Sequence, residues 1–327
     1  MPGLRFARST STGWKWFSGP AGGEPAVDTA TPPVSAARTR VGGIGGATKE
    51  QTSAALPLIR SAPGGFTALL ARWVDLQPSP GPLAPAAVAS LAASLEWAQD
   101  LGLPVLLRVE VDPSWLPAAW WSPGYLDARR DLMAALAAAP GVGDCPALAV
   151  VGSGMPLSHG FSDATVRAGA LAAGYTLEDD LAATRSTLDA MADVWAPLGV
   201  STMLTLVPHE GVLPNGSLET SVDRSVEMGE YLIARLGSLA VLSLGGFTSA
   251  TSGPLVDWAA SEVATPLHVR MASLARHTAD GVTPAMTVER AIAIAACSVE
   301  LSPGATDGWS TEQAADFNAR LRANLAV

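Results

Sequence analysis

The sequence predicts an α/β protein of the (β/α)8 TIM barrel class with an irregular N-terminal arm. Eight short apolar runs have the length of buried strands, and Ala/Leu-rich stretches of helical length lie between most of them. Strand–helix alternation repeated eight times is typical of a parallel barrel surrounded by helices. The expected strands are residues 40–45, 66–73, 105–111, 147–152, 202–208, 239–244, 267–271 and 298–301.

Two domains are expected, an arm over residues 1–39 and a barrel over residues 40–327. The arm is rich in Gly, Pro, Ser and Thr, which are loop and linker signals. The 327 residues exceed the roughly 250 that such a barrel needs. The glycine-rich run 42–46 matches neither phosphate-loop pattern, so we interpret it as the first strand.

Helices are expected after most strands, over residues 49–61, 86–101, 125–138, 177–198 and 311–325. Gly102 follows the second of these in the usual C-terminal position. Residues 159–173 are expected to form a long loop. The carboxylates Glu178, Asp179 and Asp180 fall in the first turn of the fourth helix, where they suit the helix dipole better than they suggest a metal site.

Composition excludes several classes of function. The net charge is −10, and Lys15 and Lys49 are the only lysines, so a phosphate-neutralising surface for nucleic acid is not expected. No apolar run reaches the length of a membrane-spanning helix, and residues 1–20 lack the apolar stretch of a signal peptide. Cys145 and Cys297 are expected to be buried thiols. No Cys/His spacing indicates a metal, and no cofactor is expected.

The arm carries an aromatic cluster, Trp14, Trp16 and Phe17, which predicts an interface. Such side chains need an apolar surface to cover them. Two interpretations stay open: the arm docks on its own barrel, or it docks on other subunits of an assembly.

Part of the chain resembles the second and third strands of clan A glycoside hydrolases, which are retaining barrel glycosidases. The end of the chain resembles their eighth strand, and the likeness covers about fifty residues in motif and most of the barrel in layout. The motif residues are the runs 71–78, 80–82, 97–108 and 112–115, with Cys297-Ser298-Val299-Glu300-Leu301 for the eighth strand.

The resemblance implies an acid/base glutamate after the fourth strand and a nucleophile glutamate after the seventh. Neither is present. Residues 152–162 after the fourth strand contain no acid, and residues 271–279 after the seventh contain none before Asp280. A retaining mechanism needs two carboxyls about 5–5.5 Å apart. The sequence therefore departs from the family where the chemistry would take place.

Other residues could replace the missing acids. The candidate catalytic residues are Glu110, Glu210, Glu300 and His209, all near strand ends. Glu110 shares a strand face with Arg108, which also predicts a structural ion pair. His209 and Glu210 form the best-placed acid/base couple, although a His beside a Glu on a loop is more often a solvated pair.

Aromatic and polar side chains near the predicted mouth indicate a sugar-binding surface. Flat Trp faces stack on apolar sugar faces and anchor many binding surfaces. Trp120 and Trp121 could instead pack their loop onto the barrel. The predicted substrate-binding residues are Trp73, Trp115, Trp120, Trp121, Arg108 and His159.

These observations favour a non-catalytic, glycosidase-like barrel that is a structural or glycan-binding component of a larger assembly. Barrels of this degenerate kind look similar to minor tail proteins of actinobacterial phages, which implies a virion location and a cell-wall glycan as partner. The alternative is an active retaining glycoside hydrolase with relocated carboxylates. A lyase or isomerase barrel is a third hypothesis, without a phosphate-binding signature to support it.

Overall fold

The computed structural model describes residues 7–8, 15–16, 38, 40–117, 119–153, 160–262 and 264–325. The chain separates into two compact units, residues 1–31 and residues 32–327. In the first unit, β1 (Ala7–Arg8) and β2 (Lys15–Trp16) pair antiparallel. Of the predicted interface cluster, Trp14 and Phe17 lie outside the described residues, and only the backbone of Trp16 is described.

The second unit begins before Arg40, the expected start of the barrel. Arg38 explains why this region groups with the barrel. Its amide donates to the carbonyl of Gly199, and its guanidinium donates to the carbonyls of Cys145, Leu148 and Gly143. These carbonyls precede or begin strands, so Arg38 is fastened to the N-terminal end of the barrel.

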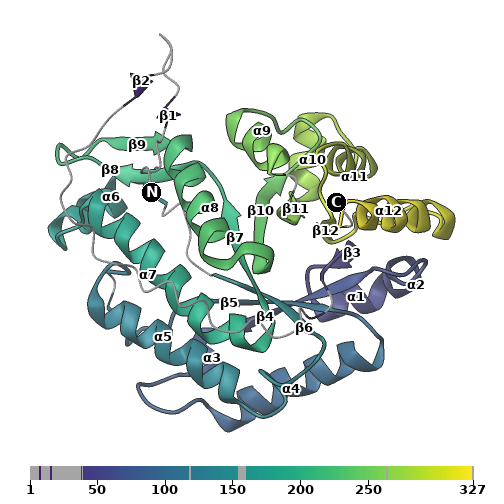
Figure 1. Cartoon of the computed structure of the whole chain (residues 1–327), viewed down its shortest axis with the longest axis horizontal. Helices are drawn as coiled ribbons and strands as arrows, with labels where there is room; N and C mark the ends of the chain where they lie inside the picture. The colour runs from purple at the N-terminus through teal and green to yellow at the C-terminus, as the bar shows by residue number, and fades with distance from the viewer. Residues whose placement is uncertain are drawn as a thin grey trace, which may run out of the picture. The chain divides into compact units, whose positions relative to one another are not determined.

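The second unit is a closed barrel of eight parallel strands, which confirms the predicted fold class (Figure 1). All eight expected strands are present, with ends shifted by a few residues. Around the barrel they follow chain order, and the last strand pairs with the first. The strands are β3 (Gly43–Gly46), β4 (Phe66–Arg72), β5 (Val105–Glu110), β6 (Leu148–Gly152), β7 (Ser201–Leu206), β10 (Ala240–Phe247), β11 (Leu267–Met271) and β12 (Ser298–Leu301).

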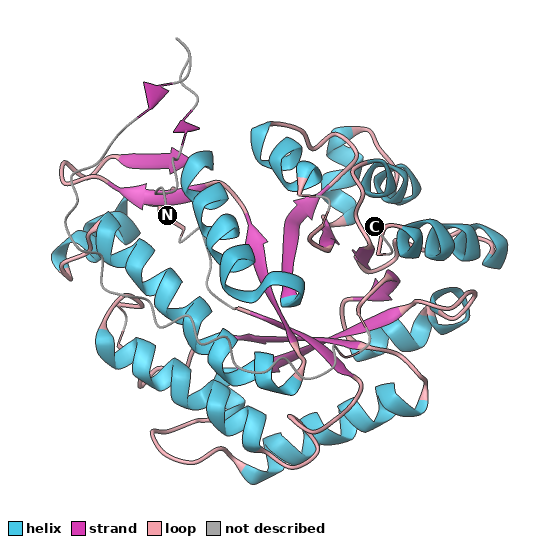
Figure 2. Cartoon of the chain, viewed as in Figure 1, coloured by secondary structure: helices cyan, strands magenta, loops and turns pink. Residues whose placement is uncertain are grey.

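Helices surround the strands, as Figure 2 shows. Most of them start at a Ser, Thr or Asp whose side chain accepts from a backbone amide in the first turn, the usual N-cap arrangement. They are α1 (Lys49–Ala54), α2 (Leu56–Ile59), α3 (Trp73–Leu76), α4 (Pro85–Asp100), α5 (Pro123–Ala138), α6 (Ala164–Ala172), α7 (Leu177–Trp195), η1 (Ala196–Leu198), α8 (Val222–Leu236), η2 (Gly237–Leu239), α9 (Pro254–Ser261), α10 (Leu274–Asp280), α11 (Pro284–Ala293) and α12 (Thr311–Ala323).

Three segments differ from the sequence prediction. The helix expected over residues 49–61 is split into α1 and α2, because Pro57 at the start of α2 cannot donate to the preceding turn. The loop expected over residues 159–173 contains α6, capped by Asp163. After β7, the chain forms an antiparallel hairpin of β8 (His209–Val212) and β9 (Leu218–Ser221).

The core has two layers, one between strands and helices and one inside the barrel. The inner layer is formed by Val41, Phe66, Ala68, Leu106, Ala149, Val150, Met203 and Val241. Asn318 on α12 closes the ring. It accepts from the amide of Ile44 on β3 and donates to the carbonyls of Leu58 and Ile59. The last helix is therefore bonded to the first strand.

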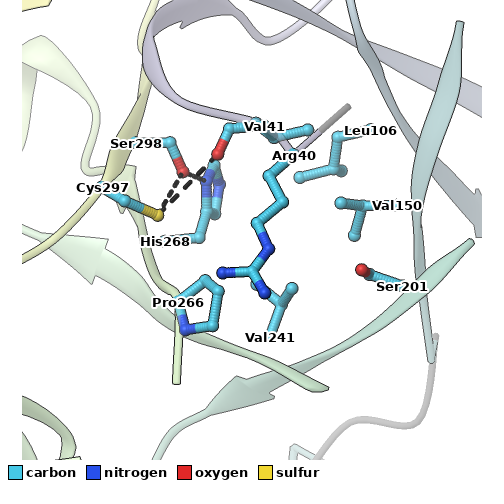
Figure 3. A pocket seen from close by; sticks show the side chains of 10 residues that line it. All are labelled: Arg40, Val41, Leu106, Val150, Ser201, Val241, Pro266, His268, Cys297 and Ser298. Atoms are coloured by element: carbon cyan, nitrogen blue, oxygen red, sulfur yellow. Dashed lines mark hydrogen bonds between the residues drawn. The ribbon is translucent and has the colours of Figure 1, made fainter. Parts of the chain in front are cut away.

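Among the described residues, the N-terminal end of the barrel encloses a small cavity of about 10 Å³, room for one water molecule (Figure 3). Figure 3 shows Cys297 beside Ser298, whose hydroxyl lies 2.9 Å from Nδ1 of His268. Both cysteines are buried and free, as predicted. Burial raises the pKa of the Cys297 thiol to about 11. This end of the barrel is therefore a packed base, which leaves the opposite end as the place for function.

Candidate binding site at the barrel mouth

Inward positions at the C-terminal ends of seven of the eight strands, all except β3, are here called the mouth layer. Side chains alternate along a strand, so a residue two or four positions after an inward-facing residue also faces inward. Each mouth-layer residue stands two or four positions after a residue that faces the barrel interior. The mouth layer consists of Leu70, Arg108, Gly152, Thr205, Gly245, Arg270 and Glu300.

Four of the seven mouth-layer residues are exposed or partly exposed, whereas Arg108, Gly152 and Glu300 are buried. Leu70 on β4 is 45% exposed, and the Arg270 side chain on β11 is 49% exposed. Thr205 on β7 and Gly245 on β10 are partly exposed as well. A ligand can therefore reach this level of the barrel from the C-terminal side.

Glu300 is the charged centre of the mouth layer. Its Oε1 lies 3.0 Å from Nη2 of Arg108 and 3.4 Å from Nε of Arg270, and its Oε2 lies 3.8 Å from Nε2 of His268. The carboxylate is 1% exposed. Two arginines on opposite sides of β12 thus share one buried counter-ion.

Burial by itself would raise the pKa of Glu300, because it penalises the charged form. The nearby His268 ring and the charges of Arg108 and Arg270 outweigh this effect and hold the pKa below its ordinary value. Glu300 is therefore a carboxylate at neutral pH. A carboxylate cannot serve as the general acid of a glycosidase.

Several buried polar atoms around Glu300 lack a well-aligned hydrogen bond within the described residues. They are Nε and Nη1 of Arg108, both carboxylate oxygens of Glu300 and Nε2 of His268. Buried polar groups are normally hydrogen-bonded to protein or to ordered water. Their convergence marks this part of the barrel as a place for water or for a polar ligand.

Glu110 stands at the rim, at the end of β5. Its Oε1 lies 3.8 Å from Nη1 of Arg108, and its side chain is 41% exposed. The next residue, Val111, has a φ of 64° and is 48% exposed. Left-handed backbone at a β-branched residue is strained and tends to occur at functional sites. The strain supports a binding role for this corner of the mouth.

His209 and Glu210 lie on the β8–β9 hairpin, where His209 is fully buried and its Nε2 lies 3.1 Å from Asp180. The Glu210 carboxylate accepts from the amide of Phe161. The solvated pair considered from the sequence is therefore wrong for His209, because the hairpin folds it inward against α7.

Asp180 holds this region together. Its carboxylate accepts from Nε1 of Trp120 at 2.8 Å and from the hydroxyl of Tyr175 at 3.0 Å, in addition to contacting His209. Asp180 is fully buried. The sequence predicted that Asp180 interacts with the helix dipole. Its main contacts are instead these side-chain contacts, which join α7 to the loop after β5 and to the hairpin.

The predicted aromatic surface is mostly used for packing. Trp73 lies on α3, outside the ring of strands, and is fully buried. Its Nε1 donates to Gln77, and the ring of Trp115 packs edge-on against the ring of Trp73. Trp120 and Trp121 pack edge-on against each other, with ring centroids 4.6 Å apart, in a cluster with Phe161 and Tyr175. His159 lies outside the described residues.

The strand ends that would carry glycosidase acids have none. β6 leads into Ser153, a buried residue whose carbonyl accepts from Arg129, and β11 leads into Ala272 and Ser273. Within the described ranges, no group of three or more His, Cys, Asp and Glu side chains could hold a metal ion. Across the same residues, no helix has the length and apolarity needed to cross a membrane.

The mouth-layer residues that the sequence prediction missed are Arg270, Leu70, Thr205 and the two glycines, and His268, which lies deeper in the barrel, was missed as well. Strand periodicity could have found Arg270, since Glu300, Arg270 and Arg108 all occupy inward positions near strand ends. His268 has no such signal, because its position halfway along a strand predicts a core residue.

Comparison with known proteins identifies the fold. No protein-family model and no curated protein matches the sequence. The structure is similar to a β-glucosidase, with a TM-score of 0.51, 12% identity, and coverage of 77% of this chain and 78% of that one. It is also similar to an exo-β-1,4-mannosidase from Opitutaceae bacterium strain TAV5, with a TM-score of 0.54, 12% identity, and coverage of 88% of this chain and 62% of that one.

A third similar structure is endo-glycoceramidase II from Rhodococcus sp., with a TM-score of 0.51, 14% identity, and coverage of 86% of this chain and 78% of that one. The chain therefore has a glycoside hydrolase-like barrel fold. At this level of identity the likeness concerns the fold alone, and activity has to be argued from the site.

Proposed function

We propose that this protein is a non-catalytic, glycosidase-like barrel that binds glycan at its mouth as a component of a larger assembly. The observation that carries the proposal is the state of Glu300. This carboxylate is buried, ionised and shared by Arg108 and Arg270. A carboxylate engaged as a counter-ion is poorly placed to act as nucleophile or acid.

The ends of β6 and β11 support the same conclusion. The residues that follow them in the described chain are Ser153, Ala272 and Ser273, which offer no carboxyl group. Retaining hydrolysis needs a protonated and an ionised carboxyl facing each other across the scissile bond. The open mouth layer, with its donors and the exposed Leu70, suits binding without cleavage.

The alternative is an active retaining glycosidase that uses Glu300 as nucleophile and Glu110 as acid/base. One observation favours it, because both carboxylates contact the same guanidinium, that of Arg108. They are therefore close to one another in the mouth. This alternative predicts that Glu110→Gln and Glu300→Gln each abolish turnover while the protein stays folded.

Two assays on the full chain separate these functions. Purified bacterial cell walls and insoluble polysaccharides are pelleted with the protein, and the same materials and aryl β-glycosides are tested for hydrolysis. Binding without any released sugar supports the proposal. Release of sugar by the wild type that is lost in Glu110→Gln refutes it and establishes the glycosidase. The surface variant Arg320→Gln on α12 is the matched control, since Arg320 pairs with Glu289 and Asp316 away from the mouth.

The assembly that we propose is a phage tail tip, with the protein as a minor tail component. The proposal rests on the resemblance to degenerate barrels of such tails and on the aromatic arm cluster that includes Trp14. Labelling of purified virions with an antibody against the barrel tests it. Labelling confined to tail tips supports the assignment, and virions that lack the protein refute it.

A further inference from the structure

The mouth layer is divided into a charged half and a small half. Arg270 and Glu300 project from the neighbouring strands β11 and β12, and Arg108 projects from β5. The strands between β5 and β11 are β6, β7 and β10, whose mouth-layer residues are Gly152, Thr205 and Gly245. A Cβ on Gly245 would lie 3.1 Å from Thr205 Cγ2, which confirms that the two face the same side.

The two arginines flank the small half and both reach the same oxygen. Nη2 of Arg108 and Nε of Arg270 lie 3.0 and 3.4 Å from Oε1 of Glu300. Their guanidinium groups are therefore close enough for one ligand group to contact both. Thr205 on β7 and Gly245 on β10 lie beside the two arginines and are partly exposed. Neither residue has a long side chain that would cover the space beside the guanidinium groups.

Both arginines have donors that form no hydrogen bond within the described residues. Nε and Nη1 of Arg108 are buried with no hydrogen-bond acceptor among the described residues. Within the same residues, Arg270 forms only its ion pair with Glu300, through Nε. Glu300 is almost fully buried behind them. A ligand that enters the mouth therefore meets the exposed guanidinium of Arg270 first, with the buried donors of Arg108 and the carboxylate behind it.

We infer that the mouth binds an anionic group of a saccharide, seated over Gly152, Thr205 and Gly245 between Arg108 and Arg270. This inference rests on the proposed glycan-binding function and names its ligand class. Arginine guanidinium groups bind carboxylates and phosphates through paired, charge-assisted hydrogen bonds. Glu110 lies at the rim with its carboxylate 3.8 Å from Nη1 of Arg108, so it competes with the ligand for this guanidinium group.

The test compares three sugars that differ only at C6: glucose, glucuronate and glucose 6-phosphate. Binding to the full chain is titrated by amide NMR at low ionic strength. We expect one or both anions to bind about tenfold or more tightly than glucose, as charge-assisted hydrogen bonds do. The preferred anion distinguishes a carboxylate from a phosphate ligand. Added salt should weaken anion binding and leave glucose binding unchanged.

Variants assign the effect to the site. Arg270→Gln should reduce anion binding by about tenfold, because it removes one charge-assisted partner. Arg270 is half-exposed, so the fold should tolerate this change. Glu110→Gln should strengthen anion binding, since it removes the competing carboxylate. The control Arg320→Gln should change nothing.

The outcomes separate this inference from the function on which it rests. Glucose binding as tightly as both anions overturns the inference and leaves glycan binding intact. Anion binding that Arg270→Gln does not weaken also overturns it. If none of the three sugars binds, the inference fails, and cell-wall pelleting then decides whether glycan binding itself stands.

Discussion

Arg108 on β5 and Glu300 on β12 meet inside the barrel at 3.0 Å, although β3 and β4 separate their strands in the wall. The pair crosses the barrel interior just below the mouth. Arg270 joins from β11 on the other side of β12. The three side chains connect the first and last parts of the barrel through one buried carboxylate, so the stability of the barrel and the proposed ligand site depend on the same group.

Glu300→Gln should destabilise the protein by about 3–5 kcal/mol, because it leaves Arg108 buried without its counter-ion. Glu110→Gln is the matched control and should cost less than about 1 kcal/mol, since Glu110 is half-exposed and pairs at 3.8 Å. Urea unfolding followed by circular dichroism measures both. Equal stability of Glu300→Gln and wild type would show that the ion pair between Arg108 and Glu300 makes no net contribution to the free energy of unfolding.

The pH dependence of stability should also reveal the contribution of the ionised Glu300. The pKa of Glu300 is lower in the folded protein than its ordinary value of 4.5. Its ionised form therefore stabilises the fold fully above that value, and the contribution is lost as pH falls through the lower folded pKa. Unfolding measured from pH 7 down to the acid limit should show a smaller loss for Glu300→Gln than for wild type. Parallel curves for the two proteins would contradict this expectation.

Asp180→Asn should destabilise the region formed by α7, the hairpin and the loop after β5. The substitution removes the charge that accepts from Trp120 and Tyr175, and such buried networks cost about 3 kcal/mol or more to break. Tyr175→Phe removes one hydrogen bond and should cost about 1 kcal/mol. Thermal unfolding ranks the two variants, and the opposite order would place the main restraint elsewhere.

Gly45→Ala should destabilise the barrel by about 1–3 kcal/mol through overpacking. A Cβ at Gly45 would lie 2.6 Å from ring atoms of Phe66, which is fully buried inside the barrel. Gly169→Ala is the matched control with the opposite sign. Gly169 lies on α6 with no atom within 4 Å of its Cβ position, so alanine should stabilise by up to about 1 kcal/mol. Melting temperatures should shift in opposite directions.

Ala295→Gly should stabilise the protein by about 0.5–1 kcal/mol. Ala295 follows α11 with a φ of 61°, and the amides of Ala295 and Ala296 donate to the carbonyls of Ile292 and Ala291. This is the helix-ending motif in which glycine is preferred, because it has no Cβ to strain in the left-handed region. Chemical unfolding checks the sign, and a less stable variant would mean that unfolded-chain entropy dominates.

The fold could be predicted because its signals are local. Strands such as Leu148–Gly152 are buried on both faces and are continuous apolar runs in the sequence, and the helices between the strands carry N-cap residues. The same locality explains the errors. Pro57 splits a helix because it lacks one backbone donor, and α6 was missed because it is only nine residues long.

The site could be predicted only in part. Arg108 and Glu110 alternate on one strand, so their shared face follows from strand periodicity, and their ion pair is present. Trp73 shows the limit of this reasoning. A tryptophan at a strand end is equally consistent with a position in the mouth and with a position between the strands and the helices. Its packing against Trp115 and Tyr125 shows that Trp73 takes the second position.

By itself, the sequence determined that the chain forms an eight-stranded barrel and that two strand ends lack the acids of a retaining glycosidase. Both are properties of short segments, where side-chain type and spacing suffice. Only the tertiary structure decided that Glu300 joins Arg108 and Arg270 and that Asp180 and His209 are buried together. These contacts join residues far apart in the chain, and ring closure is what brings their strands and helices within the range of an ion pair.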